Sequence, residues 1–96
     1  MTKKYNGELL RAAIEGDSVR IHDALNAGAD INATDMSGWT PLFYAAILGN
    51  QQAVSVLIAA GAKIELEDKD GITAAELADE ACRSMFEQNV NPTHVH

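Results

Sequence analysis

The sequence predicts an all-α solenoid of stacked helix-turn-helix units, because it repeats itself with a period of 33 residues. Residues 27–31 (AGADI) return as residues 60–64 (AGAKI), and residues 35–40 (DMSGWT) return as residues 68–73 (DKDGIT). A fixed period of this length is typical of arrays in which each unit packs against its neighbours. The hydrophobic fraction is 47%, and much of it is alanine, which suits closely stacked short helices.

The first helix of a unit is clearest in the middle copy. Thr40 stands at the N-cap position, where its hydroxyl can accept a hydrogen bond from a helix N–H group. Pro41 follows at the first helical position, where its missing N–H costs no hydrogen bond. We therefore expect a short helix over residues 42–48, ended by Gly49.

A second helix follows the tight turn. Asn50 is a favourable N-cap residue, and the pattern predicts a helix that runs through Ala60. Apolar side chains recur along this helix at i, i+3 and i+4: Val54, Leu57 and Ile58. Gly61 then ends the helix as a left-handed C-cap residue would. Each unit is therefore expected to be helix, turn, helix.

The segments between units carry an Asp-x-x-Gly pattern, at residues 35–38 and again at residues 68–71. Asp at the first position and Gly at the last fit a type I turn followed by a left-handed residue. We interpret these segments as hairpin-like fingers that project between units, and not as strands of a sheet.

The ankyrin repeat family is the one that this chain resembles closely, through residues 35–46 (DMSGWTPLFYAA), Gly49-Asn50, Leu57-Ile58 and Gly61-Ala62. The resemblance covers residues 7–80, and a full motif repeated in phase is highly specific. It implies an ankyrin-repeat solenoid, with stacked helix-turn-helix units joined by hairpin-like fingers.

On this basis we expect a single ankyrin-repeat domain over residues 1–96. The N-terminal capping repeat would span residues 6–34, the full internal repeat 35–67 and an incomplete C-terminal capping repeat 68–90, with 91–96 as a frayed tail. The first copy lacks the Thr-Pro start and carries charged residues, as a terminal unit with a hydrated outer face should.

The third copy departs further from the family pattern. The family usually has His where Phe43 and Glu76 stand. Glu76 completes a Thr73-x-x-Glu76 capping box, which satisfies two N-terminal amides by another route. Phe43 offers no hydrogen bond, so we expect it to pack. The repeat register places the turn of the third unit at Cys82-Arg83.

The acidic balance constrains the partner. The chain has seven basic and fourteen acidic residues, for a net charge of −7. This charge argues against nucleic-acid backbones and anionic membrane surfaces as partners. No segment approaches the roughly 18 apolar residues that a membrane helix needs. Seven of the acids lie within residues 61–80. They form either a solvated face or the footprint of a partner protein with a basic surface.

No arrangement of residues predicts catalysis, so we expect no enzyme, no cofactor and no metal site. The serines lack a G-x-S-x-G context, and there is no glycine-rich phosphate loop. Cys82 is the single cysteine, so it cannot form an intrachain disulfide and is expected to be a buried thiol in the reducing cytoplasm. His22 is expected to face solvent, and His94-x-His96 lacks a third ligand.

The ankyrin resemblance implies binding through the finger tips and the concave side of the first helices. The candidate partner-binding residues at those positions are Met36, Ser37, Trp39, Ile47, Leu48, Glu67, Asp70 and Ile72. An apolar strip with a polar rim marks an interaction site, and Trp is the residue type most enriched in hot spots. The alternative is that Trp39 folds over its own finger and that Ile47 and Leu48 bury between helices.

Two functions follow from this set. The first is a non-enzymatic protein–protein interaction module, either an adaptor or a stoichiometric inhibitor, that docks one partner by its concave face. The second is a structural or assembly subunit that self-associates, or docks onto a larger assembly, through its incomplete C-terminal end, where Met85, Phe86 and Val90 would make the contact. The first predicts a monomer and the second predicts weak self-association.

Overall fold

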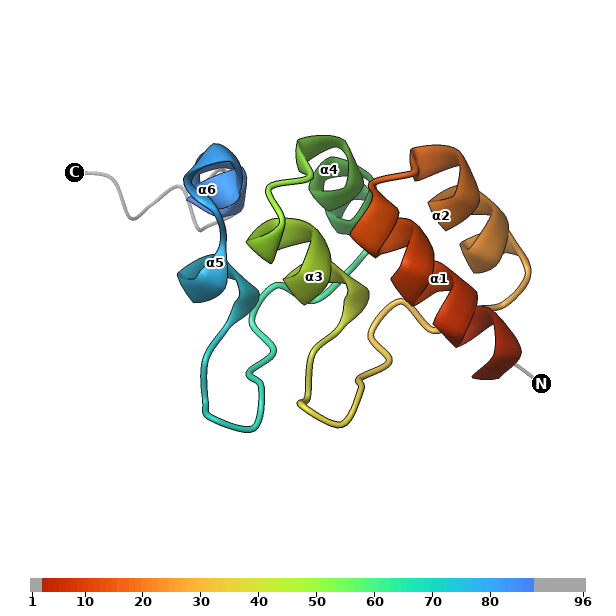
Figure 1. Cartoon of the computed structure of the whole chain (residues 1–96), viewed down its shortest axis with the longest axis horizontal. Helices are drawn as coiled ribbons and strands as arrows, with labels where there is room; N and C mark the ends of the chain where they lie inside the picture. Colours follow the sequence, from red (N-terminus) through yellow and green to blue (C-terminus); the bar gives the residue numbers. More distant parts are fainter. Residues whose placement is uncertain (1–2, 88–96) are drawn as a thin grey trace.

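The structure, a computed structural model, describes residues 3–87, and within them it contains helices and no strand (Figure 1). The helices are α1 (Lys3–Glu15), α2 (Ser18–Asn26), α3 (Pro41–Ile47), α4 (Gln51–Ala59), α5 (Ala74–Leu77) and α6 (Glu80–Glu87). Antiparallel pairing is limited to an isolated bridge between Glu67 and Thr73. The predicted all-α class is confirmed.

The six helices form two rows (Figure 1). α1, α3 and α5 pack side by side in one row, and α2, α4 and α6 form the other. Two long loops leave the helical body on the same side, at the edge of the first row (Figure 1). These loops are the predicted fingers, and we call them finger 1 (residues 31–40) and finger 2 (residues 64–73).

The core runs continuously through all three helix pairs. Many of its buried residues are alanines, whose small side chains allow helix axes to approach closely. The larger buried side chains of this core are Leu9, Ile21, Leu42, Phe43, Val54, Leu57, Cys82 and Phe86. His22 is exposed and Cys82 is buried, as predicted.

The middle pair follows the sequence prediction to within one residue at each helix end. Thr40 has extended backbone angles at the N-cap of α3, and Pro41 is the first helical residue. Gly61 has φ +100° directly after α4, in the left-handed region that the C-cap interpretation requires. Helix ends fray by a residue or two, so these differences are small.

Asn50 occupies the predicted N-cap of α4 but its side chain does not cap that helix. Its Nδ2 instead donates hydrogen bonds to the carbonyl oxygens of Ala13 and Ile14, at 3.2 and 3.1 Å. The last carbonyls of a helix have no partner within the helix, so those at the end of α1 are available to it. Asn50 therefore joins the first unit to the second.

The first unit differs from the others because α1 begins early, at Lys3. It has 13 residues where α3 has 7, so a helical extension stands where the other units have a finger. Asn6, which the repeat register assigns to a finger position, lies in this extension. Its Oδ1 accepts a hydrogen bond from the Asp30 backbone N–H at 2.7 Å.

The third unit corrects the sequence prediction in one place. The capping box is confirmed: Thr73 Oγ1 accepts from the Glu76 N–H at 3.3 Å, and Glu76 Oε1 accepts from the Thr73 N–H at 2.9 Å. The turn predicted at Cys82-Arg83 is wrong, because α6 already begins at Glu80 and contains both residues.

Asp79 explains the early start of α6. Its backbone N–H donates to the Ala46 carbonyl of the middle unit at 2.9 Å. Its Oδ2 accepts from the Ala81 N–H at 3.0 Å, within the first turn of α6. Gln51 Nε2 of α4 donates to the Ala81 carbonyl at 2.6 Å. These contacts with the middle unit set the position at which α6 begins in the third unit. The 33-residue period alone does not determine that position.

The C-terminal end also differs from the expectation of an open contact surface. Phe86 is 3% exposed and belongs to the core, so it is unavailable to a second copy. Met85 is half-buried against that core. Val90 and the tail 91–96 lie outside the described residues, as does the His94-x-His96 pair.

Candidate protein-binding surface

Each finger reverses direction at a turn that is closed by an equivalent backbone hydrogen bond. The Gly38 N–H donates to the Asp35 carbonyl, and the Gly71 N–H donates to the Asp68 carbonyl, each at 3.0 Å. Gly38 has φ +83°, as the predicted left-handed residue should. The Asp-x-x-Gly pattern at residues 35–38 and 68–71 therefore forms the two turns that it predicts.

The aspartate side chains hold these turns rigidly. Asp35 Oδ1 accepts from the N–H groups of Ser37 and Trp39, at 2.9 and 3.0 Å. Asp68 Oδ1 does the same for Asp70 and Ile72, at 2.8 and 3.0 Å. A short carboxylate that accepts from the following amides is the standard Asx arrangement. It fixes the tip that each finger presents.

The two fingers also hold each other. The Lys69 N–H donates to the Ser37 carbonyl at 3.2 Å, and Trp39 Nε1 donates to Asp68 Oδ2 at 2.9 Å. A Cβ on Gly38 would lie 3.0 Å from the Lys69 nitrogen, so only glycine allows this approach. The fingers therefore form one unit instead of two independent loops.

Three aromatic rings fill the base of finger 1. Trp39 stacks on Phe43 with centroids 6.1 Å apart and an interplanar angle of 9°. Tyr44 meets Trp39 edge-on at 5.1 Å, and its hydroxyl donates to Asp35 Oδ2. Phe43 packs, as predicted. The role of Tyr44 was not predicted, because nothing in the local pattern points its hydroxyl at Asp35.

This network shifts the pKa of its members. Burial raises the pKa of Asp35, but hydrogen bonds from Tyr44, Trp39 and Ser37 outweigh it, so the net pKa is lowered. The Ile72 amide and the Trp39 indole lower the pKa of Asp68. The hydrogen bond to Asp35 raises the pKa of Tyr44. Both aspartates are therefore carboxylates at neutral pH.

The eight candidate partner-binding residues fall into two places. Met36 is 88% exposed at the tip of finger 1, with Ser37 beside it and Asp70 at the tip of finger 2. Leu48 is 52% exposed after the end of α3, next to the half-buried Ile47. A helix of seven residues is about 10 Å long, so α3 separates the two groups.

The remaining candidates lie nearer the base of the fingers. Trp39 and Ile72 are half-buried, and Glu67 is exposed. Trp39 thus combines a scaffold contact, through Asp68 and Phe43, with a partly accessible ring. Ile14 adds an apolar side chain, 41% exposed, near the end of α1.

One exposed apolar residue was not predicted. Val19 lies in the first turn of α2, in the second row of helices, and is 68% exposed. It is away from the fingers and serves below as a control position.

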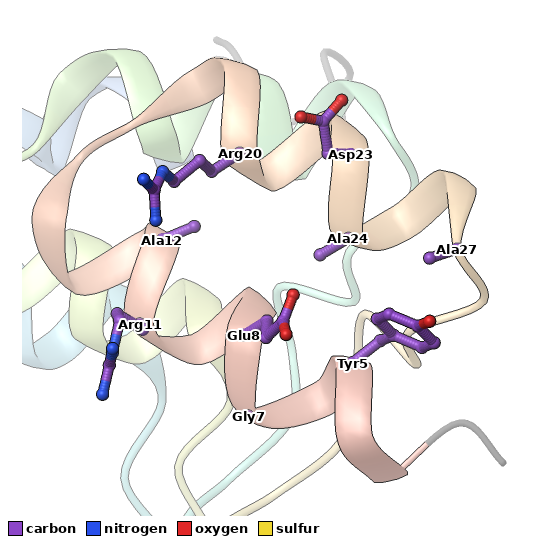
Figure 2. Close-up of a pocket in the computed structure, with 9 residues that line it drawn as sticks. All are labelled: Tyr5, Gly7, Glu8, Arg11, Ala12, Arg20, Asp23, Ala24 and Ala27. Carbon is purple, nitrogen blue, oxygen red and sulfur yellow. The ribbon is translucent and has the colours of Figure 1, made fainter.

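An open groove of about 800 Å³ lies between α1 and α2 (Figure 2). Ala12 and Ala24 form its floor, and charged residues from both helices surround it. Figure 2 shows the Glu8 carboxylate rising from α1 between the helices, while the Arg20 guanidinium extends from α2 toward α1. Arg20 Nε also pairs with Asp17 at 3.4 Å. The lining contains no Ser, Cys or His nucleophile or base.

A family model described as ankyrin repeats, in three copies, matches residues 9–94. The chain belongs to the ankyrin repeat family. Ankyrin repeats are generally protein–protein interaction modules and are typically non-enzymatic. The fingers and helix pairs described above are therefore those of an ankyrin-repeat solenoid.

Several larger ankyrin repeat proteins are similar to this chain. Ankyrin repeat domain-containing protein 37 of Bos taurus is 44% identical over 54 residues, which cover 56% of this chain and 34% of that protein. Protein phosphatase 1 regulatory subunit 12A of Mus musculus is 35% identical over 77 residues, covering 80% of the chain and 8% of that protein. The 2-5A-dependent ribonuclease of Mus musculus is 39% identical over 69 residues, which cover 71% of this chain and 9% of that protein.

The chain thus spans between 8% and 34% of the length of these curated relatives, so their whole-protein activities do not transfer to it. Within residues 3–87, no helix is long and apolar enough to cross a membrane. In the same span, no three His, Cys, Asp or Glu side chains gather as a metal site.

Proposed function

We propose that this ankyrin-repeat chain is a non-enzymatic module that docks a partner protein through its finger tips and concave face. It would act sterically, as an adaptor or a stoichiometric inhibitor. The observation that carries the proposal is Met36, an apolar side chain 88% exposed on a finger fixed by hydrogen bonds. Leu48 and the partly accessible Trp39 extend the apolar contact.

Rigidity makes this exposure useful for binding. Association costs free energy for every loop that it has to order, and a pre-organised loop avoids much of that cost. Finger 1 is held internally by Asp35 and laterally by the Lys69 N–H. Its tip therefore presents Met36 in one arrangement, and Met is well suited to irregular protein surfaces.

The charge supports a partner with a basic surface. Glu67 and Asp70 are exposed on finger 2, near its base and at its tip respectively, and the chain carries a net charge of −7. Complementary charge would raise the association rate and make binding salt-dependent.

We further propose the organisation in which this module works. The capping, internal and C-terminal repeats would correspond to residues 6–34, 35–67 and 68–90. A monomer is favoured over self-association, because Phe86 at the C-terminal end is already buried. The reducing cytoplasm would keep the Cys82 thiol intact.

The test compares two substitutions of exposed apolar residues by the same charged residue. Met36→Asp on finger 1 should abolish capture of the partner from native lysate, because it places a carboxylate in a desolvated contact. Val19→Asp on α2 should leave capture unchanged. Equal thermal stability of the two variants shows that both are folded. Capture that survives Met36→Asp, or that Val19→Asp also abolishes, would contradict the proposed surface.

A further inference from the structure

A small notch lies between α1 and finger 1, beside the aromatic cluster. Four apolar residues line it, Leu10, Ala33, Trp39 and Pro41, together with Asn6, Gly7, Thr34 and Asp35. Its volume is about 170 Å³, below the range of about 300–1,000 Å³ that is usual for small-molecule pockets. The notch therefore suits a single inserted side chain better than a cofactor or metabolite.

Asp35 is the charged residue among those that line the notch, and its carboxylate is incompletely used. A carboxylate has about four lone-pair sites, and Asp35 uses three, for the Ser37 and Trp39 amides and the Tyr44 hydroxyl. One acceptor site is left on Oδ2. Among residues 3–87, the recorded ion pair is Arg20 with Asp17, so no described cation neutralises Asp35.

The combination of apolar walls and one charge selects the occupant. A purely apolar side chain would fill the walls but would desolvate the carboxylate without giving it a partner, which is unfavourable. A lysine ammonium is compact and strongly hydrated. An arginine guanidinium is more weakly hydrated, can stack on an aromatic ring and donates in a plane.

We propose that this notch receives an arginine side chain from a basic segment of the partner protein. The proposal rests on the proposed function and names the chemistry that the surface would recognise. The aliphatic stem would contact Leu10 and Pro41, and the guanidinium would donate to Asp35 Oδ2 beside the Trp39 ring. Met36 would then engage an apolar neighbour of the same segment.

The experiment uses N-acetyl-arginine methylamide as the probe and its citrulline counterpart as a neutral control of nearly identical shape. Binding is followed by NMR through the indole N–H signal of Trp39, which is unambiguous because the chain has one Trp. We expect a saturable shift with arginine and affinity lower by about tenfold or more with citrulline, since a charge-assisted hydrogen bond is lost. The absence of a saturable shift, or equal affinities, would overturn the proposal.

Three variants locate the site. Asp35→Asn keeps a carbonyl acceptor but removes the charge, and should weaken arginine binding by about tenfold. Asp23→Asn on α2 removes the same charge from an exposed carboxylate outside the notch, and should change affinity less than about twofold, because solvent and salt screen it. Ala33→Met extends a side chain from a notch wall and should block the probe while Asp35 remains. Equal effects of Asp35→Asn and Asp23→Asn would overturn the proposal.

The outcomes separate this inference from the proposed function. If the probe fails to bind while Met36→Asp still abolishes partner capture, the notch proposal is overturned and the docking function stands. If the probe binds in an Asp35-dependent way while Met36→Asp leaves capture intact, the notch is supported and the proposed docking surface is contradicted.

Discussion

Two glycines form a matched pair that tests the helix assignments directly. Gly7 lies in the middle of α1, and Gly61 lies just after α4 with φ +100°. A Cβ built on either glycine meets no atom within 4 Å. Substitution by alanine therefore adds no clash at either position, and the backbone conformation alone decides the sign of the effect.

The expected magnitudes follow from that difference. Mid-helix alanine is more favourable than glycine by about 0.5–1 kcal/mol, so Gly7→Ala should stabilise the fold. At Gly61 an alanine would be held in the left-handed region, at a cost of about 1–2 kcal/mol. With about 4–8 °C of Tm per kcal/mol for a domain of this size, Gly7→Ala should raise Tm by about 2–8 °C. Gly61→Ala should lower it by about 4–16 °C.

Thermal melts followed by far-UV circular dichroism, with urea titrations alongside, measure both variants against the parent chain. The two shifts should have opposite signs. A lower Tm for Gly7→Ala would show that the first turns of α1 are not helical in solution. An unchanged Tm for Gly61→Ala would refute the left-handed C-cap.

Two further predictions concern the contacts between units. The folded chain lowers the pKa values of Asp35 and Asp68, so in acid the unfolded chain binds more protons than the folded chain. The free energy of unfolding should therefore fall as pH drops below about 4. The raised pKa of Tyr44 predicts a second loss as pH rises above about 10. Trp39 fluorescence reports both transitions, and the acid loss should be smaller in Asp35→Asn; an equal loss in that variant would refute the assignment. Asn50→Ala should destabilise the chain by about 1–3 kcal/mol in urea titrations, because it removes two hydrogen bonds to the end of α1; a change within error would mean that water replaces them without cost.

The features that sequence analysis predicted are those in which the residues that determine a turn or a helix end lie within a few positions of it in the chain. Thr40-Pro41 starts a helix, Gly61 ends one, and Asp35 with Gly38 closes a finger, each through groups a few residues apart. The capping box at Thr73 is equally local. Repetition at a fixed period then implied stacking, because one such unit cannot bury its apolar face alone.

The features that it did not predict depend on groups about thirty residues apart. Asn50 was expected to cap its own helix but binds the preceding unit, and the register of α6 is set by Asp79 and Gln51 contacts between units. Trp39 is a candidate from the sequence because it stands at a finger position and Trp is the residue type most enriched in hot spots. Its hydrogen bond to Asp68 comes from the close approach of two fingers, which a single copy of the repeat does not show.

The most direct test of the binding surface is amide hydrogen exchange of the chain with and without the purified partner. Protection on binding should appear at the tips of both fingers, around residues 36–38 and 69–71, and at residues 47–48 after α3. Protection confined to α2 and α4, with unchanged exchange at the finger tips, would contradict the account.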